Sequence, residues 1–187
     1  MGKYAAYWDM DVPFEEASLK YLVSTTLKFN MYGIPYVGAD SCGNVTTSNW
    51  NETLCYTWYN LATMLPMSRT GRIEMKNFTQ YSFFSNMFYF FTRPFDYMIY
   101  TRLVDVSEKG GMAWYPVFFD FAEDQYVDNP EGALVISEHM IHFPPLTTAS
   151  QYSVKLPKNE SWWSCSYSCG KIMTPDKADR SYTVYNQ

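Results

Sequence analysis

Strand-like and helix-like segments alternate along roughly the first two thirds of this 187-residue chain. Short β-prone runs are separated by segments in which apolar residues recur at helical spacing, as Leu19, Leu22, Val23 and Leu27 do. The expected strands are 2–8, 34–39, 65–68 and 112–121, and the expected helices are 13–30, 52–64 and 81–106. Strands that alternate with helices in this way pair in parallel, so the sequence predicts an α/β fold built from βα units.

The run from Ile34 to Ala39 carries the clearest functional signal, because it ends abruptly in Asp40 among small residues. A buried parallel strand has this form when it delivers a carboxylate to the mouth of an α/β barrel.

The chain changes character after Asp124. Short apolar runs at 133–136 and 153–156 lie between turn residues such as Pro144 and Pro145. These features predict a small antiparallel β region. We therefore expect one domain over residues 1–124 and the start of a second over residues 125–187.

Charge and hydropathy argue against several classes of function. The formal net charge of −5 argues against a nucleic-acid partner. No apolar run approaches the ~20 residues of a membrane span, and the N-terminus does not read as a signal peptide. Aromatic residues make up 19% of the chain, which suits sugar stacking and core or interface packing equally. We expect no metal or cofactor, because the cysteines lack CxxC spacing and His139 and His142 lie in another segment.

Four N-x-S/T sequons begin at Asn44, Asn51, Asn77 and Asn159. They are either chance matches or marks of a longer precursor that enters the secretory or lysosomal route; the compartment itself does not follow from the sequence. Cys42 and Cys55 could close a short disulfide loop, as could Cys165 and Cys169, and four free thiols in a reducing compartment remain the alternative.

Several segments, in order, resemble glycoside hydrolase family 31, the family of α-glucosidases and sucrase-isomaltase. The first two are GKYAAYW at 2–8 and GIPYVGADSCG at 33–43. The next are LCYTW at 54–58 followed by LPMSR at 65–69, and WYPVFFDFAED at 114–124. The resemblance continues to about Met173 through GALVIS at 132–137 and the Trp162-Trp163 pair. It implies strands five to eight of a (β/α)8 barrel for residues 1–124, followed by the start of a C-terminal β-sandwich.

The resemblance also implies roles for four residues. Asp11 matches the acid/base aspartate, although it could instead cap the helix expected at Pro13. Asp40 matches a residue that binds sugar hydroxyls, with a plain turn residue as the alternative. Trp8 matches a pocket-floor tryptophan or a core residue. Arg69 matches an arginine that orients the carboxylates of the pocket, or forms a surface ion pair of little energetic value.

The sequence departs from the family pattern at three positions. Gly71 replaces a histidine that donates to a sugar hydroxyl, Tyr7 replaces the histidine before the tryptophan, and Asn44 replaces an aromatic residue. By the resemblance, the nucleophilic aspartate ends strand four, upstream of Met1. Retaining glycosidases need both carboxyl groups, so we expect this chain to be inactive on its own.

Two functions follow from these expectations. The favoured one is a pseudoenzyme or structural subunit of a larger assembly, in which a protein partner covers the open half-barrel. The alternative is one chain of an active retaining α-glucosidase that a separate N-terminal half completes. In both cases α-glucosides are the ligands to consider.

Overall fold

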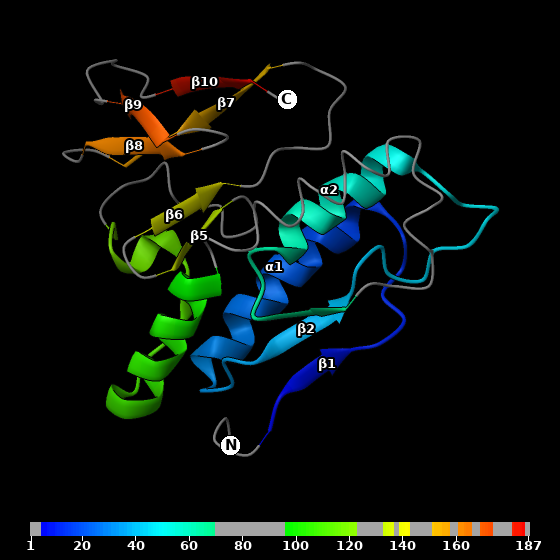
Figure 1. The fold of residues 1–187 in the computed structure, drawn as a ribbon, viewed down its shortest axis with the longest axis horizontal. Helices are drawn as coiled ribbons and strands as arrows, with labels where there is room; N and C mark the ends of the chain where they lie inside the picture. Colours follow the sequence, from blue (N-terminus) through cyan, green and yellow to red (C-terminus); the bar gives the residue numbers. More distant parts are fainter. Residues whose placement is uncertain are drawn as a thin grey trace.

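The computed structural model describes residues 5–69, 96–122, 133–136, 139–142, 151–157, 161–165, 169–173 and 181–185. Its first part is a parallel sheet in the order β1-β2-β3 (Figure 1). The strands are β1 (Tyr7–Asp9), β2 (Val37–Asp40) and β3 (Met67–Arg69). They are connected by the helices α1 (Glu16–Met31) and α2 (Glu52–Ala62). The predicted α/β class and parallel pairing are therefore present, with strands a few residues shorter than expected.

The helix α1 begins later than the sequence predicts. Its N-cap is Glu15 in an extended conformation, and the side chain of Glu15 makes no capping hydrogen bond. Pro13 lies before the helix, in a turn in which its carbonyl accepts from the Glu15 N–H. The preceding residue, Val12, is buried and its carbonyl accepts from the Asn44 N–H at 2.7 Å. This long-range contact holds residues 11–14 against the loop after β2, so the helix starts only at Glu16.

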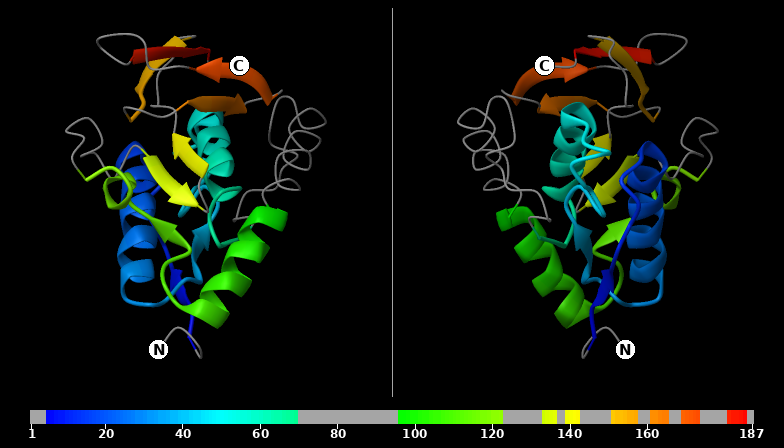
Figure 2. Two further views of the ribbon diagram at one scale, coloured as in Figure 1. Left: turned by 90° about the vertical axis from the view of Figure 1, so that its left-hand side faces the viewer. Right: turned by 90° about the vertical axis from the view of Figure 1, so that its right-hand side faces the viewer.

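Residues 96–109 form a helix, which is the described part of the expected helix 81–106. Residues 81–95, including the expected bend at Pro94, lie outside the described residues. Figure 2 shows this helix and α1 on opposite sides of the parallel strands. The sheet is therefore covered on one side by α1 and faced on the other by the helix of residues 96–109.

The expectation of a strand over residues 112–121 is largely wrong. Only β4 (Trp114–Tyr115) is extended, and a 3-10 turn, η2 (Val117–Phe119), follows Pro116. Pro116 has no N–H with which to continue a ladder, so the strand stops there. Nor does β4 join the parallel sheet: it pairs antiparallel with β5 (Ala133–Ile136).

A buried asparagine explains where β4 lies. Asn30 of α1 is 1% exposed, and its Oδ1 accepts from the backbone N–H groups of Ala113 and Trp114, both at 3.2 Å. The Trp114 indole is fully buried and donates to the Met64 carbonyl at 2.8 Å. These contacts fix β4 against the C-terminal end of α1 and the residues after α2.

Among the described residues, the later strands pair with antiparallel neighbours. They are β6 (His139–His142), β7 (Gln151–Lys155), β8 (Trp162–Cys165), β9 (Cys169–Met173) and β10 (Ser181–Tyr185). β5 pairs with β6, β7 with β10, and β8 with β9, where Cys165 lies opposite Cys169. Strands β7 to β10 lie together at the end of the molecule farthest from the N-terminus (Figure 1). The expected domain boundary at Asp124 lies outside the described residues, and the β4–β5 pair joins strands from either side of it.

Candidate functional site

Strand register places three of the expected site residues on one face of the parallel sheet. Trp8 lies opposite Gly38, and Asp40, two residues beyond Gly38, lies opposite Arg69. Alternate residues of a strand share a face, so Trp8, Asp40 and Arg69 face the same way. The opposite face carries Tyr7, whose ring stacks on Phe29 of α1 with centroids 4.0 Å apart.

Asp40 and Arg69 form a two-pronged ion pair at the carboxyl ends of β2 and β3. The Arg69 Nε lies 2.6 Å from Asp40 Oδ1, and an Arg69 terminal nitrogen lies 2.8 Å from Oδ2. This geometry engages both carboxylate oxygens and gives the pair directional strength beyond that of a single contact. The hydrogen bond from Arg69 to Asp40 raises the pKa of the guanidinium, so Arg69 stays charged.

Trp8 completes this cluster from β1. The Arg69 guanidinium carbon lies 5.3 Å from the centroid of the Trp8 ring, within the range of a cation–π contact. The Asp40 side chain is 14% exposed, whereas the Arg69 side chain is 65% exposed. The Asp40 carboxylate is thus largely buried, and the Arg69 guanidinium that binds it remains open to solvent. We call Trp8, Asp40 and Arg69 the strand-end cluster.

Asp11 lies on the loop that leaves β1 and is exposed, with a positive φ of 57°. It does not cap α1, because that helix begins at Glu16 with Glu15 at its N-cap. The capping alternative for Asp11 is therefore wrong. Its neighbour Val12 binds Asn44, so the Asp11 loop and the loop after Asp40 are joined at the same end of the sheet.

Asp9 is a carboxylate to which sequence motifs assign no role. It ends β1 on the face that carries Tyr7, and its Oδ2 atom is buried with no hydrogen-bond partner among the described residues. A hydrogen bond to Asp9 raises the pKa of Tyr21 on α1. Asp9 therefore belongs to the contact between sheet and helix, away from the strand-end cluster.

A cavity of about 680 Å³ adjoins this cluster. Trp8 and Arg69 line it from the sheet, and Asp96 and Tyr100 line it from the helix of residues 96–109. Sequence reasoning missed the last two, although their separation of four residues places them on one face of a helix. Apolar and small residues complete the lining: Ala62, Thr63, Leu65, Pro66, Met67, Ser68, Ile99 and Leu103. Aromatic rings beside a carboxylate and a guanidinium are suited to binding a polar ring such as a sugar.

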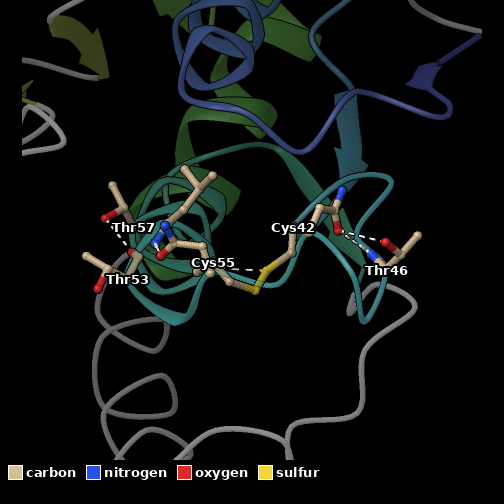
Figure 3. Close-up of a disulfide and its surroundings, with 8 residues drawn as sticks. Cys42, Thr46, Thr53, Cys55 and Thr57 are labelled. Atoms are coloured by element: carbon tan, nitrogen blue, oxygen red, sulfur yellow. Dashed lines mark hydrogen bonds between the residues drawn. A yellow bond between two sulfur atoms is a disulfide. The ribbon is translucent and has the colours of Figure 1, made fainter.

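A disulfide between Cys42 and Cys55 ties the loop after β2 to α2 (Figure 3). Both cysteines are buried, and the pairing is one of those that the sequence left open. The loop is organised by short polar contacts, in which Asn49 Oδ1 accepts from the Thr46 N–H at 2.6 Å and from its hydroxyl at 3.0 Å. At the end of the loop, Asn51 Oδ1 accepts from the Leu54 N–H at 3.1 Å and caps α2.

The other expected site residues are only partly covered by the structure. Asn44 and Asn51 are exposed, whereas Asn77, Asn159 and Gly71 lie outside the described residues. His139 and His142 are the two ends of β6. Within the described part of the chain, no three His, Cys, Asp or Glu side chains are grouped so that they could hold a metal ion. The same part contains no helix that is long and apolar enough to cross a membrane.

Residues 1–95 match the family model for the glycosyl hydrolases family 31 TIM-barrel domain. The lysosomal alpha-glucosidase of Mus musculus is 30% identical over 190 residues, an alignment that covers 95% of this chain and 20% of that protein. An alpha-glucosidase of Hordeum vulgare is 40% identical over 68 residues, which cover 36% of this chain and 8% of the relative.

Solved structures of the same family share the fold. The GH31 dextranase of Flavobacterium johnsoniae in complex with glucose superposes with a TM-score of 0.78 at 16% identity and covers 98% of this chain. A glucosidase II alpha subunit superposes with a TM-score of 0.72 at 18% identity and covers 95% of this chain. The chain spans about a quarter or less of the length of these proteins.

Proposed function

This chain belongs to glycosyl hydrolase family 31, and from that premise we propose that its strand-end cluster is the sugar-binding half of an α-glucosidase-like site. The observation that carries the proposal is the convergence of Trp8, Asp40 and Arg69 at the carboxyl ends of three adjacent parallel strands. Functional sites of α/β barrels lie at this end of the strands. In this proposal Asp40 accepts hydrogen bonds from sugar hydroxyls, Arg69 orients it, and Trp8 forms the pocket floor.

Asp11 is the proposed proton donor. In a retaining glycosidase one carboxyl group protonates the leaving oxygen and later removes a proton from water, while a second carboxylate, about 5–5.5 Å away, attacks the anomeric carbon. The contact between Val12 and Asn44 supports this role, because it keeps the Asp11 loop at the same end of the sheet as Asp40. We assign no nucleophile within residues 1–187.

We therefore propose that a polypeptide of residues 1–187 does not hydrolyse α-glucosides, because it supplies only one carboxyl group of the pair that a retaining glycosidase needs. In the favoured form of the proposal, these residues serve as a non-catalytic, structural part of a larger assembly. The bidentate hold of Arg69 on Asp40 leaves each carboxylate oxygen able to accept a further hydrogen bond, so it fits both forms of the proposal. In the alternative, a companion segment supplies the nucleophile and the combined site is an active retaining α-glucosidase.

A protein partner is part of both forms. β1 pairs only with β2 among the described residues, so its other edge offers unpaired backbone groups. Met10 and Tyr36, next to β1 and β2, are 72% and 41% exposed. We propose that a strand of the partner covers this edge and buries those side chains.

The test of inactivity is turnover of an α-glucoside by purified residues 1–187. We expect no product above the rate of the Asp11→Asn variant. Turnover that Asp11→Asn abolishes would refute the proposal for this polypeptide.

The test of the two forms uses the natural assembly that contains this chain. Companion sequence with βα units and an essential aspartate at a strand end, together with α-glucosidase activity, would establish the alternative form. An assembly without that activity would establish the structural form.

Maltose titration followed by tryptophan fluorescence, in the parent protein and in Trp8→Phe and Asp40→Asn, reports whether the strand-end cluster binds sugar. Asp105→Asn on the helix of residues 96–109, whose partner is Lys109, is the matched surface control.

A further inference from the structure

The disulfide-closed loop contains two sequons, and the structure presents both to solvent. Asn44-Val45-Thr46 and Asn51-Glu52-Thr53 both lie between Cys42 and Cys55. The cysteines are 2% and 1% exposed and Val45 is 3% exposed. The acceptor asparagines and the threonines of both sequons are exposed. The loop thus turns its apolar side inward and both acceptor sites outward.

The role of Asn51 in the fold is compatible with modification of its side chain. The helix cap uses only the carbonyl oxygen of the amide, which accepts from the Leu54 N–H. N-glycosylation uses the nitrogen of the same amide and keeps the carbonyl oxygen. A glycan at Asn51 can therefore coexist with the capped start of α2.

Asn44 is likewise fixed through its backbone. Its N–H donates to the Val12 carbonyl, and the preceding Gly43 N–H donates to the Asp40 carbonyl at 3.0 Å. These backbone contacts do not use the side-chain amide nitrogen to which a glycan would be attached. A glycan at Asn44 would rise from the end of the sheet that carries Asp40 and Asp11.

The disulfide supplies an independent argument. Structural disulfides form in oxidising compartments such as the endoplasmic reticulum lumen, and sequons are used in proteins of the same secretory route. A chain that forms the Cys42–Cys55 bond in the endoplasmic reticulum forms it in the same compartment in which sequons are modified. We infer that Asn44 and Asn51 both carry N-linked glycans. This inference does not rest on the proposed function.

The reaction balances with a polyprenyl-diphosphate-linked oligosaccharide as the donor. The amide nitrogen of each asparagine forms a bond to the anomeric carbon of the first sugar. The bond from that carbon to the diphosphate oxygen breaks, the polyprenyl diphosphate leaves, and the amide nitrogen loses one proton. No electron transfer is involved.

A single peptide tests the inference on the natural protein. Trypsin cuts after Lys28 and Arg69 with no site between them, so residues 29–69 hold both asparagines and both cysteines. We expect an unreduced peptide with one internal disulfide. After treatment with an amidase that removes N-glycans, we expect aspartate at positions 44 and 51. An unmodified asparagine at either position, or two free thiols, would overturn the inference.

Matched variants in a secreting eukaryotic host separate the use of each sequon from folding. Thr46→Ala and Thr53→Ala should each lose one glycan, seen as one shift to lower apparent mass on a gel. Thr46→Ser and Thr53→Ser keep the sequons and should migrate with both glycans. Asn51→Asp removes the acceptor nitrogen but retains a capping oxygen, so it should lose one glycan and still fold. Equal mobility of the alanine and serine variants at a position would refute modification there.

Discussion

Replacing Gly43 by alanine should destabilise the protein strongly, because two independent costs meet at this residue. Gly43 has a φ of +50°, a left-handed conformation that costs a residue with a Cβ roughly 1–2 kcal/mol. An added Cβ would collide with the Val12 carbonyl oxygen and lie 2.9 Å from Cη2 of Trp58. Neither neighbour can give way easily, since the Val12 carbonyl is held by Asn44 and Trp58 is 1% exposed. Overpacking a close-packed site costs about 1–3 kcal/mol, so we expect a total loss of roughly 2–5 kcal/mol.

Gly33→Ala is the matched control. Gly33 has a φ of +77°, but an added Cβ there would meet no atom within 4 Å. Its cost should be the backbone cost alone, roughly 1–2 kcal/mol. The assay is urea unfolding of both variants and the parent, with the disulfide intact, followed by tryptophan fluorescence. If the two variants lose equal stability, the close approach of the Asp11 and Asp40 loops at Gly43 is refuted.

Three further predictions concern the same part of the chain. Asn51→Ala should lower the free energy of unfolding by about 1 kcal/mol through loss of the helix cap, whereas Asn51→Asp should change it by a few tenths, both measured by urea unfolding. Removal of the disulfide by Cys42→Ala with Cys55→Ala should cost about 3 kcal/mol, because the bond closes a loop with a sequence separation of 13 residues; unchanged thermal stability would contradict its formation. Burial raises the pKa of Tyr59, so the folded state favours the neutral phenol. This contribution to stability should be complete below the ordinary pKa of 10.0 and be lost as the pH rises from there through the raised pKa of the folded state. Tyr59→Phe should reduce this loss of stability in thermal scans at increasing pH.

Local signals were enough to predict the parallel units. The apolar spacing of α1 and α2 and the strand that ends in Asp40 can be read within short windows, and the structure has these elements within a few residues of the expected bounds. The start of α1 could not be read in this way. Pro13 suits a first helical position, but Val12 is engaged by Asn44, which is distant in sequence and outside any helical window.

The strand expected at 112–121 failed for a related reason. Its residues have high β-propensity, which reflects how well a side chain packs on a half-buried surface rather than which partner it meets. The position of this segment is fixed by Asn30, whose side chain binds the backbone at positions 113 and 114, more than 80 residues later. Asp96 and Tyr100 were missed as cavity residues because no motif links them to Trp8; only the packing of their helix against the sheet does so.

The amino-acid sequence by itself determined the α/β class, the resemblance to family 31, and the residue types available to the candidate site. Those properties follow from local periodicity and from short motifs. Tertiary structure alone decided that Arg69 binds Asp40 and also lies over the Trp8 ring. It also decided that Asp11 caps no helix and that Cys42 pairs with Cys55. The physical reason is strand register: a shift of one residue would turn Trp8, Asp40 and Arg69 to opposite faces of the sheet, and register is set by contacts between segments far apart in sequence.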